Sequence, residues 1–344
     1  MISVGEMARG LAFDPELDGE GVPTRPLVIL DLTEEASAAQ VAAAARLLRD
    51  CPAVTIGVAG TGVAGPVGDL VDDLDLTLIE SVDTPAYRPL VAVPDVVEAV
   101  DAVADSVNRN PMAALTFAHV LRATARLDVR NGLHAEAAAY SMLLSGREIG
   151  AWVRARGPRV IPDGGVDRVR VRRDAQVLHI ELNRPSRRNA MDGLLREQLV
   201  EALEIAVADP ALTVELAGSG PVFCAGGDIA EFGTAIDYAA AYFVRLQRHP
   251  GWLLYRLRDR AKVRVHGACV GAGLEIPAFA GQVSSAPGTV FSLPEVGMGL
   301  IPGAGGTVSI TRRIGRWRTA WLGLTGTGID AATARDWGLV DEIA

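Results

Sequence analysis

Two glycine-rich loops hold the residues best suited to chemistry, FCAGGD at 223–228 and GAGLE at 271–275. A glycine-rich turn from a strand into a helix leaves backbone N–H groups unpaired at the positive end of the helix dipole. Gly226-Gly227 and Gly271-Ala272-Gly273 could therefore aim two N–H donors at one carbonyl oxygen, which would form an oxyanion hole. Tight turns with close backbone packing are the commoner reason for such glycines.

Two glutamates accompany these loops. Glu275 begins the helix expected after the second loop, and Glu295 follows Pro294 at an expected strand end, 20 positions later. Two carboxyl groups near one reacting carbon suit general acid and base catalysis, because crowding and desolvation split their pKa values. The alternative for each residue is a solvated surface glutamate, since glutamate side chains are mostly exposed.

Other candidate sites are weaker. GTGVAG at 60–65 fits the GxGxxG dinucleotide pattern, but Pro66 follows at once and no clear helix opens there. His266 is expected to be a hydrogen-bonded structural residue, because no second histidine lies at metal-ligand spacing. Asp228 is predicted to cap a helix after AGGD rather than to perform chemistry. Packing is the expected role of three tryptophans, Trp317, Trp321 and Trp337.

The composition excludes several classes of protein. With 33 Lys and Arg against 42 Asp and Glu, a formal charge of −9 and 5% aromatic residues, the chain lacks the basic, stacking face that binds nucleic acid. Its cysteines have no metal-ligand spacing and are expected to be buried small side chains, so we predict neither a metal site nor a disulfide framework; they are Cys51, Cys224 and Cys269. No apolar run reaches membrane-spanning length and no secretory signal is recognised, which favours a cytoplasmic protein.

The order of apolar runs predicts how the chain is organised. LVILDL, an Ala/Leu-rich helix and PAVTIGVAG (52–60) form a strand–helix–strand unit, and the pattern returns as LHIELN, a helix from about Asp192 and PALTVELAG (210–218). The two strand segments match closely enough to suggest an internal repeat, although chance similarity is the alternative. Three amphipathic helical stretches are predicted between the copies, within 95–157. The Pro/Gly-rich segment 157–165 is predicted to be a linker, followed by a hairpin that turns near Asp174-Ala175.

Residues 163–344 resemble the crotonase (enoyl-CoA hydratase/isomerase) superfamily. The motifs that carry the resemblance stand in the family's order and spacing: NRPSRRNAM (183–191), FCAGGD (223–228), GAGLE (271–275), LPE (293–295) and IPGAGGT (301–307). The resemblance implies an α/β fold with a spiral ββα core that binds an acyl-CoA thioester. It also implies oxyanion-hole donors at the backbone of Gly227 and Ala272, and acid/base positions at Glu275 and Glu295.

The resemblance further implies a CoA-binding stretch and an assembly. The CoA-binding residues it implies are Arg187, Arg188, Ala190, Ala225 and Asp228, of which the two arginines would meet the CoA phosphates. No cofactor is expected apart from the CoA that enters with the substrate, and a homo-oligomer is expected, a trimer or a multiple of it.

The chain also departs from the family pattern. Ala272 replaces the usual glycine at the second donor, which is tolerable because the donor is backbone, and Gly281 stands where the family often has Asp. The chain stops at GLVDEIA, where family members normally continue into helices that resemble residues 95–157, so the order is expected to be permuted. We therefore predict a degenerate crotonase-like βαβ segment at 1–94, a helical subdomain at 95–157 and the catalytic core at 163–344.

The leading functional hypothesis is a 2-enoyl-CoA hydratase. A second is an enzyme that keeps the oxyanion hole but moves protons differently, either an enoyl-CoA isomerase or an acyl-CoA hydrolase. Isomerisation needs only one base, so two glutamates favour hydration. A third hypothesis, motivated by the degenerate leading segment, is an acyl-CoA-binding partner without turnover.

Overall fold

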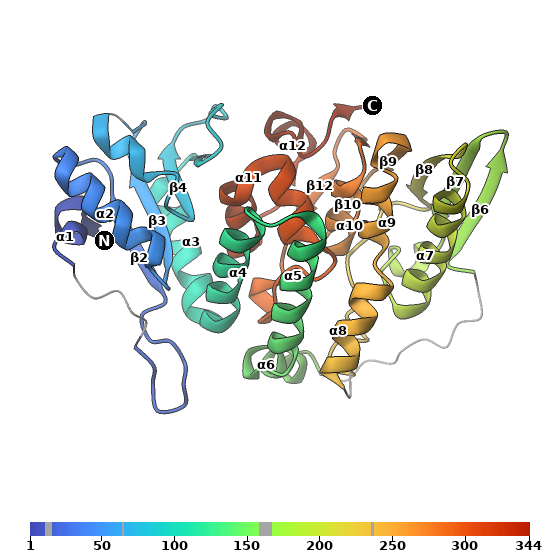
Figure 1. The fold of residues 1–344 in the computed structure, drawn as a ribbon, viewed down its shortest axis with the longest axis horizontal. Helices are drawn as coiled ribbons and strands as arrows, with labels where there is room; N and C mark the ends of the chain where they lie inside the picture. The colour runs from blue at the N-terminus through green and yellow to red at the C-terminus, as the bar shows by residue number, and fades with distance from the viewer. Residues whose placement is uncertain (11–15, 64, 158–166, 235–236) are drawn as a thin grey trace.

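The computed structural model describes residues 1–344 except 11–15, 64, 158–166 and 235–236. A five-stranded parallel sheet of order β1-β2-β3-β4-β5 occupies one end of the molecule (Figure 1). Its elements are β1 Ile2–Ser3, α1 Val4–Ala8, β2 Leu27–Asp31, α2 Ala38–Asp50, β3 Val54–Ala59, the 3-10 helix Gly65–Leu70, β4 Leu76–Glu80 and β5 Leu90–Val93. The parallel pairing of β2 with β3 across α2 confirms the first predicted strand–helix–strand unit.

Four helices follow this sheet, where three helical stretches were expected. The last expected stretch breaks at Ser145 and Gly146, because Gly146 adopts an extended conformation that begins a new helix. Asp95 and Asp128 accept backbone N–H bonds at two of the helix starts, as short acidic side chains commonly do. The helices are α3 Val96–Arg109, α4 Pro111–Thr124, α5 Val129–Leu144 and α6 Arg147–Arg156.

The remaining residues form two further sheets. The larger has order β14-β11-β9-β8-β7-β6 and opens with the predicted antiparallel hairpin, in which Ala175 takes a positive φ at the turn. Its strands are β6 Val169–Asp174, β7 Val177–Leu182, β8 Thr213–Gly218, β9 Ala261–Val265, β11 Gln282–Ser285 and β14 Glu342–Ile343. The smaller sheet holds β10 Ala268–Val270, β12 Val290–Ser292 and β13 Ile329–Asp330. The second predicted strand–helix–strand unit is confirmed by the parallel pairing of β7 and β8 across α7.

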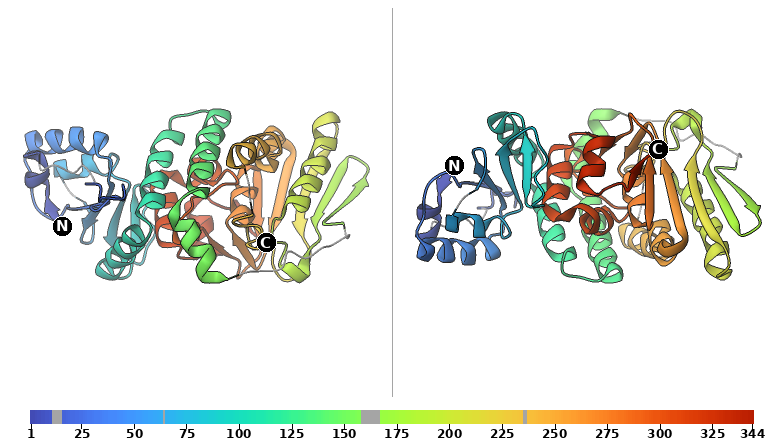
Figure 2. Two further views of the ribbon diagram at one scale, coloured as in Figure 1. Left: turned by 90° about the horizontal axis from the view of Figure 1, so that it is seen from below. Right: turned by 90° about the horizontal axis from the view of Figure 1, so that it is seen from above.

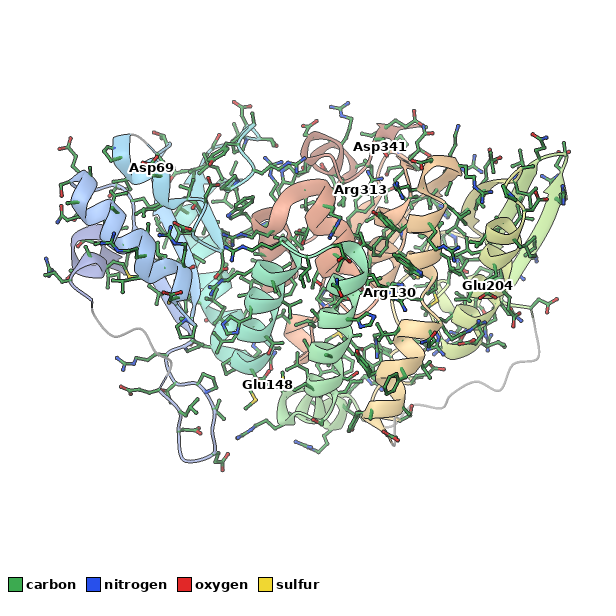
Figure 3. All side chains as sticks on the ribbon, in the orientation of Figure 1. Asp69, Arg130, Glu148, Glu204, Arg313 and Asp341 are labelled. Carbon is green, nitrogen blue, oxygen red and sulfur yellow. The ribbon has the colours of Figure 1, made fainter. Side chains whose placement is uncertain are left out.

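Helices connect and cover these two sheets. The longest, α11, packs against α4 and α5 although it lies far from them in sequence, and Figures 1 and 2 show these helices side by side. Arg313 of α11 pairs with Asp341 at 3.3 Å, near the C-terminal end in Figure 3. The helices of this part are α7 Gly193–Ala208, α8 Tyr238–Gln247, α9 Pro250–Arg256, α10 Ala272–Glu275, α11 Gly306–Thr325 and α12 Ala331–Trp337.

One apolar core runs through most of the molecule. Side chains of β3, β4 and β5 join those of α3, α4 and the two later sheets in a single cluster of buried residues. A smaller cluster lies beneath α1 and α2 on the other face of the first sheet. Within this core, α3, α4 and α11 lie against the leading sheet and connect it to the later sheets (Figure 2).

Two sequence predictions fall partly outside the described residues. The predicted linker 157–165 does so beyond Gly157, and residue 64 of the GTGVAG stretch does so as well. The described part of that stretch leads into a 3-10 helix at Gly65–Leu70, whose lack of a regular helix N-terminus gives no support to dinucleotide binding. The three-part division of the chain stays a prediction.

A buried ion-pair cluster joins the leading sheet to the rest of the chain. Asp75, 2% exposed, accepts from Arg122 Nε of α4 at 2.8 Å and from Arg316 Nη1 of α11 at 3.4 Å. We expect Asp75→Ala to lower the free energy of unfolding by about 3–5 kcal/mol, because it leaves two largely buried guanidinium groups without their carboxylate. Urea denaturation measures this change. Exposed Asp69, labelled in Figure 3, is the matched control, and an equal effect of Asp69→Ala would contradict the prediction.

Candidate active site

The two glycine-rich loops lie side by side as parallel backbone segments. Cys224 and Cys269 form an isolated parallel bridge, and Val270 N donates to the Cys224 carbonyl at 3.1 Å. A Cβ on Gly273 would lie 2.3 Å from that same carbonyl oxygen, so the close approach requires glycine there. Gly227 follows Cys224 by three positions, and Ala272 follows Cys269 by three positions. Because the two segments run parallel, the two predicted donors lie opposite each other.

Neither predicted donor amide has an acceptor in the part of the chain that the structure describes. Ala272 is the first residue of α10, where a helix leaves its N–H unpaired. The N–H groups of Gly227 and Ala272 make no hydrogen bond to any described residue. Both residues line one cavity of about 440 Å³, which Glu275 and Glu295 also line. The four residues predicted to carry the chemistry are therefore brought together.

Glu275 is a buried residue, only 2% exposed, that is held by one carboxylate oxygen. Its Oε2 accepts the N–H of Ala304 at 2.7 Å and the N–H of Gly306 at 2.8 Å. These donors belong to the predicted IPGAGGT motif, which leads into α11. Burial raises the pKa of Glu275 well above its ordinary value, and the negative charges of Glu295 and then Glu136 raise it further, while the two amide donors act in the opposite direction.

Glu295 faces Glu275 across Gly271. A Cβ on Gly271 would lie 2.3 Å from Glu295 Oε1 and 3.8 Å from Glu275 Oε1, so the two oxygens lie no farther apart than the sum of those distances. Gly271 has a φ of +49°, which also favours glycine. The other oxygen, Glu295 Oε2, is buried without a hydrogen-bond partner among the described residues. Desolvation raises the pKa of Glu295 to about 8.

A third buried glutamate, Glu136 of α5, was not predicted to belong to the site. It is 1% exposed; its Oε1 accepts from Gly305 N at 2.7 Å, and its Oε2 accepts from Thr307 N at 2.9 Å and Thr307 Oγ1 at 2.7 Å. Desolvation raises its pKa to about 7. Helical spacing places Glu136 among the buried positions of α5, which include Val129, Gly132, Leu133, Ala137 and Tyr140, but its residue type argues for exposure, so the sequence signal is divided.

Three other cavity residues escaped the sequence analysis. Tyr140 lies one turn after Glu136, and the Arg245 guanidinium of α8 stands 4.1 Å from the centre of its ring. Arg245 Nε also donates to the Gly303 carbonyl at 3.0 Å. Burial lowers the pKa of His249 to about 3, so this ring is neutral and serves as the N-cap of α9, where its Nδ1 accepts from Trp252 N. Nothing in the local sequence distinguishes these residues from ordinary helix positions.

The predicted CoA-binding residues lie on a loop joined to the first glycine-rich segment. Ala225 N donates to the Arg188 carbonyl at 3.0 Å, and the Ala190 carbonyl accepts from Arg184 Nη1 at 2.9 Å. Arg187 pairs with Asp228 at 3.3 Å, whereas the exposed side chain of Arg188 makes no ion pair with the described residues. Of the five predicted residues, only Asp228 lines the cavity.

The prediction that Asp228 caps a helix is wrong. Turns follow it, and the next helix, α8, begins at Tyr238 behind its own N-cap Asp237. Asp228 instead accepts from Arg184 Nη1 at 2.7 Å, a buried cation that the sequence analysis overlooked. Burial acts to raise the pKa of the Asp228 carboxyl, but the Ala230 N–H and then Arg184 bring it below its ordinary value. A buried arginine offers the carboxylate a stronger partner than a helix start would.

The remaining candidate residues lie outside the lining of the cavity. His266 Nε2 lies 2.9 Å from the Gly220 carbonyl, and His266 does not line the cavity. Trp321 and Trp337 are buried in the apolar core, and all three cysteines are buried. Within the described residues, no group of three His, Cys, Asp or Glu side chains could hold a metal ion, and no helix is both long and apolar enough to cross a bilayer.

Comparison with known proteins agrees with this arrangement. Residues 172–344 match the sequence model of the family described as enoyl-CoA hydratase/isomerase. The 2,3-dehydroadipyl-CoA hydratase of Escherichia coli (strain K12) is 34% identical over 175 residues, which make up 50% of this chain and 68% of that protein. The chain belongs to the enoyl-CoA hydratase/isomerase family.

Other members of the enoyl-CoA hydratase/isomerase family are similar over the same region. The mitochondrial enoyl-CoA hydratase of Pongo abelii is 35% identical over 167 residues, covering 48% of this chain and 56% of that one. The crystal structure of enoyl-CoA hydratase from Thermoplasma volcanium GSS1 gives a TM-score of 0.48 at 28% identity, covering 52% of this chain and 72% of that one. Membership of this family, together with sheets whose strands are mostly parallel, confirms the predicted α/β, crotonase-like fold class.

Proposed function

We propose that the protein hydrates the 2,3 double bond of an enoyl-CoA thioester. The observation that carries this proposal is the convergence on one cavity of two buried carboxyl groups and two amides that have no acceptor among the described residues. The amides of Gly227 and Ala272 would bind the thioester oxygen, which polarises the conjugated double bond and stabilises the enolate. The addition of water is served by two carboxyl groups, because one must take a proton from the water and the other must give a proton to carbon.

The hydrogen bonds favour one division of roles. Burial raises the pKa of both groups, that of Glu275 well above its ordinary value and that of Glu295 to about 8, so the pair retains a proton near neutral pH and the hydrogen bonds decide which group carries it. Two amides donate to Glu275 Oε2, which favours the carboxylate form, whereas Glu295 Oε2 lacks any donor among the described residues, which favours the protonated form. Glu275 would then remove a proton from water as the oxygen attacks C3, and Glu295 would deliver its proton to C2. The sum is one water added, with its oxygen on C3 and one hydrogen on C2, and no cofactor beyond CoA takes part.

The names of relatives support this reading, since several are called hydratases of CoA thioesters. The CoA phosphates would meet Arg188, whose guanidinium has no carboxylate partner among the described residues. Isomerisation of a 3-enoyl-CoA is the second candidate function, because the same oxyanion hole and a single base would serve it. The pair of facing glutamates favours hydration.

Two substrates separate the candidate functions. With crotonyl-CoA in water, we expect loss of the conjugated thioester absorbance and formation of 3-hydroxybutyryl-CoA, identified by mass spectrometry. A 3-enoyl-CoA of similar length tests the isomerase. Faster consumption of the 3-enoyl substrate would overturn the hydratase assignment, and release of free CoA thiol from either substrate would indicate a hydrolase.

A further inference from the structure

Four consecutive backbone amides are shared alternately by two carboxylates. The amides of Ala304 and Gly306 donate to Glu275, and those of Gly305 and Thr307 donate to Glu136, at distances of 2.7–2.9 Å. Glu275 belongs to the core that matches the family, whereas Glu136 comes from α5, ahead of that match. The four amides lead into α11, whose first segment runs to a break in helical geometry at Gly315, and the positive end of that segment stabilises both charges.

We propose that Glu136 is a positioning residue for Glu275. By holding the amides of Gly305 and Thr307, it fixes the loop in the one arrangement that turns the Ala304 and Gly306 amides toward Glu275 Oε2. The other oxygen, Oε1, is thereby left on the side of Gly271 and Glu295, where the proposed chemistry takes place. The helical segment ahead of the core would thus complete the active site of its own chain.

The other contacts of the loop hold its carbonyl groups and its glycine Cα atoms rather than its amides. Gly303, Gly305 and Gly306 supply no side chain that could lock it, and Gly305 has a φ of +102°. Tyr140 packs against Gly303, where a Cβ would lie 2.3 Å from its ring, and Arg245 binds the Gly303 carbonyl. Both contacts lie before Ala304.

On the other side of the loop, Phe279 packs on Gly305, where a Cβ would lie 2.4 Å from its ring, and Thr124 Oγ1 donates to the Thr307 carbonyl at 2.8 Å. Within the described residues, Glu136 and Glu275 are the side chains that accept the amides of this loop, so Glu136 fixes the direction in which those amides point.

Several charged or titratable groups face Glu136. Glu275 from α10 and Glu295 from the segment after β12 lie close enough for its negative charge to raise both of their pKa values. Arg245 from α8 acts on Glu136 in the opposite direction, and Tyr140 is the ionisable neighbour on α5 itself. Removing the charge of Glu136 should therefore lower the pKa values of the two proposed catalytic glutamates.

Glu136→Gln tests the proposal. The carboxamide keeps the shape but turns an N–H toward one of the amide donors, so the loop shifts. We expect kcat for hydration of crotonyl-CoA to fall about 10- to 100-fold with little change in KM, as when the supporting contacts of a reacting group are lost. The rate should fall at high pH as Glu295 loses its proton. Because Glu136→Gln removes a negative charge near Glu295, we expect this alkaline limb of the pH–rate profile to move to lower pH.

Glu148→Gln is the matched control. Glu148, labelled in Figure 3, lies on α6 of the same helical segment and accepts the N–H of Met112 at 2.8 Å and of Ala113 at 3.0 Å, but it does not line the cavity. It should lose comparable stability in urea denaturation and leave the pH limb in place. A Glu136→Gln enzyme with unchanged kcat and pH profile, or a control that moves the pH limb equally, would overturn the proposal.

The kinetic test rests on the proposed function, so a second readout is independent of turnover. With glutamate labelled by ¹³C at the side-chain carboxyl, NMR titration follows the Glu275 signal, assigned by its loss in Glu275→Gln. We expect its midpoint to fall in Glu136→Gln and to stay in Glu148→Gln. A wild-type protein that does not hydrate crotonyl-CoA would refute the proposed function alone, whereas an unmoved Glu275 titration would refute the role of Glu136.

Discussion

Glu275→Gln and Glu295→Gln should each lower kcat for hydration by about 10²–10⁴-fold, the contribution typical of a positioned acid or base. Glutamine keeps the size of each side chain and can still accept a hydrogen bond, but it neither takes a proton from water nor gives one to C2. KM should change little, because the thioester oxygen still meets the amides of Gly227 and Ala272. Steady-state kinetics with crotonyl-CoA measure both constants.

The pH dependence of the hydration rate tests the acid role proposed for Glu295. Glu295 has a pKa of about 8, so its proton is present below that pH, and the hydration rate should fall as the pH rises through it. The residual activity of Glu295→Gln should lack this alkaline limb. Glu204→Gln is the surface control, since that side chain is 52% exposed on α7 and is labelled in Figure 3. Full activity in both site variants would leave no acid/base role for the pair.

Ala272→Pro should lower kcat by about 10²–10³-fold, the cost of losing one donor of an oxyanion hole. Proline removes the N–H without deleting a side-chain function. The first position of a helix tolerates proline because its N–H has no helical partner, and Ala272 holds that position in α10. Rapid-quench or steady-state measurement of crotonyl-CoA hydration reports the loss.

Ala272→Gly is the matching control for this experiment. It retains the amide and removes only the methyl group, so its kcat should stay close to the wild-type value. Thermal unfolding of both variants shows whether α10 survives. A folded Ala272→Pro enzyme with wild-type kcat would mean that the thioester oxygen binds elsewhere.

Short motifs predicted which residues meet in the structure. Gly227, Ala272, Glu275 and Glu295 sit in such motifs and line one cavity, while their catalytic roles stay a prediction. Both strand–helix–strand units and the hairpin followed from apolar periodicity. These features depend on neighbours a few positions away, so a single sequence suffices to predict them.

The missed residues depend on partners far along the chain. Glu136 is separated from Gly305 by 169 positions, and only packing of α5 on α11 makes the two meet. Asp228 was expected to cap a helix because the local sequence does not reveal its actual partner, Arg184, which lies 44 positions away. A helical glutamate is usually solvated, so local pattern alone argues against its burial until a specific set of donors is known.

Contacts between distant parts of the chain also affect how the protein folds. Asn110 binds the Val296 carbonyl and Thr124 binds the Thr307 carbonyl, across 186 and 183 positions. During synthesis, the apolar faces of α4 and α5 leave the ribosome long before α11 exists to cover them. High contact order slows folding, so we expect slow refolding from denaturant and a nascent chain that depends on chaperones until its last quarter emerges.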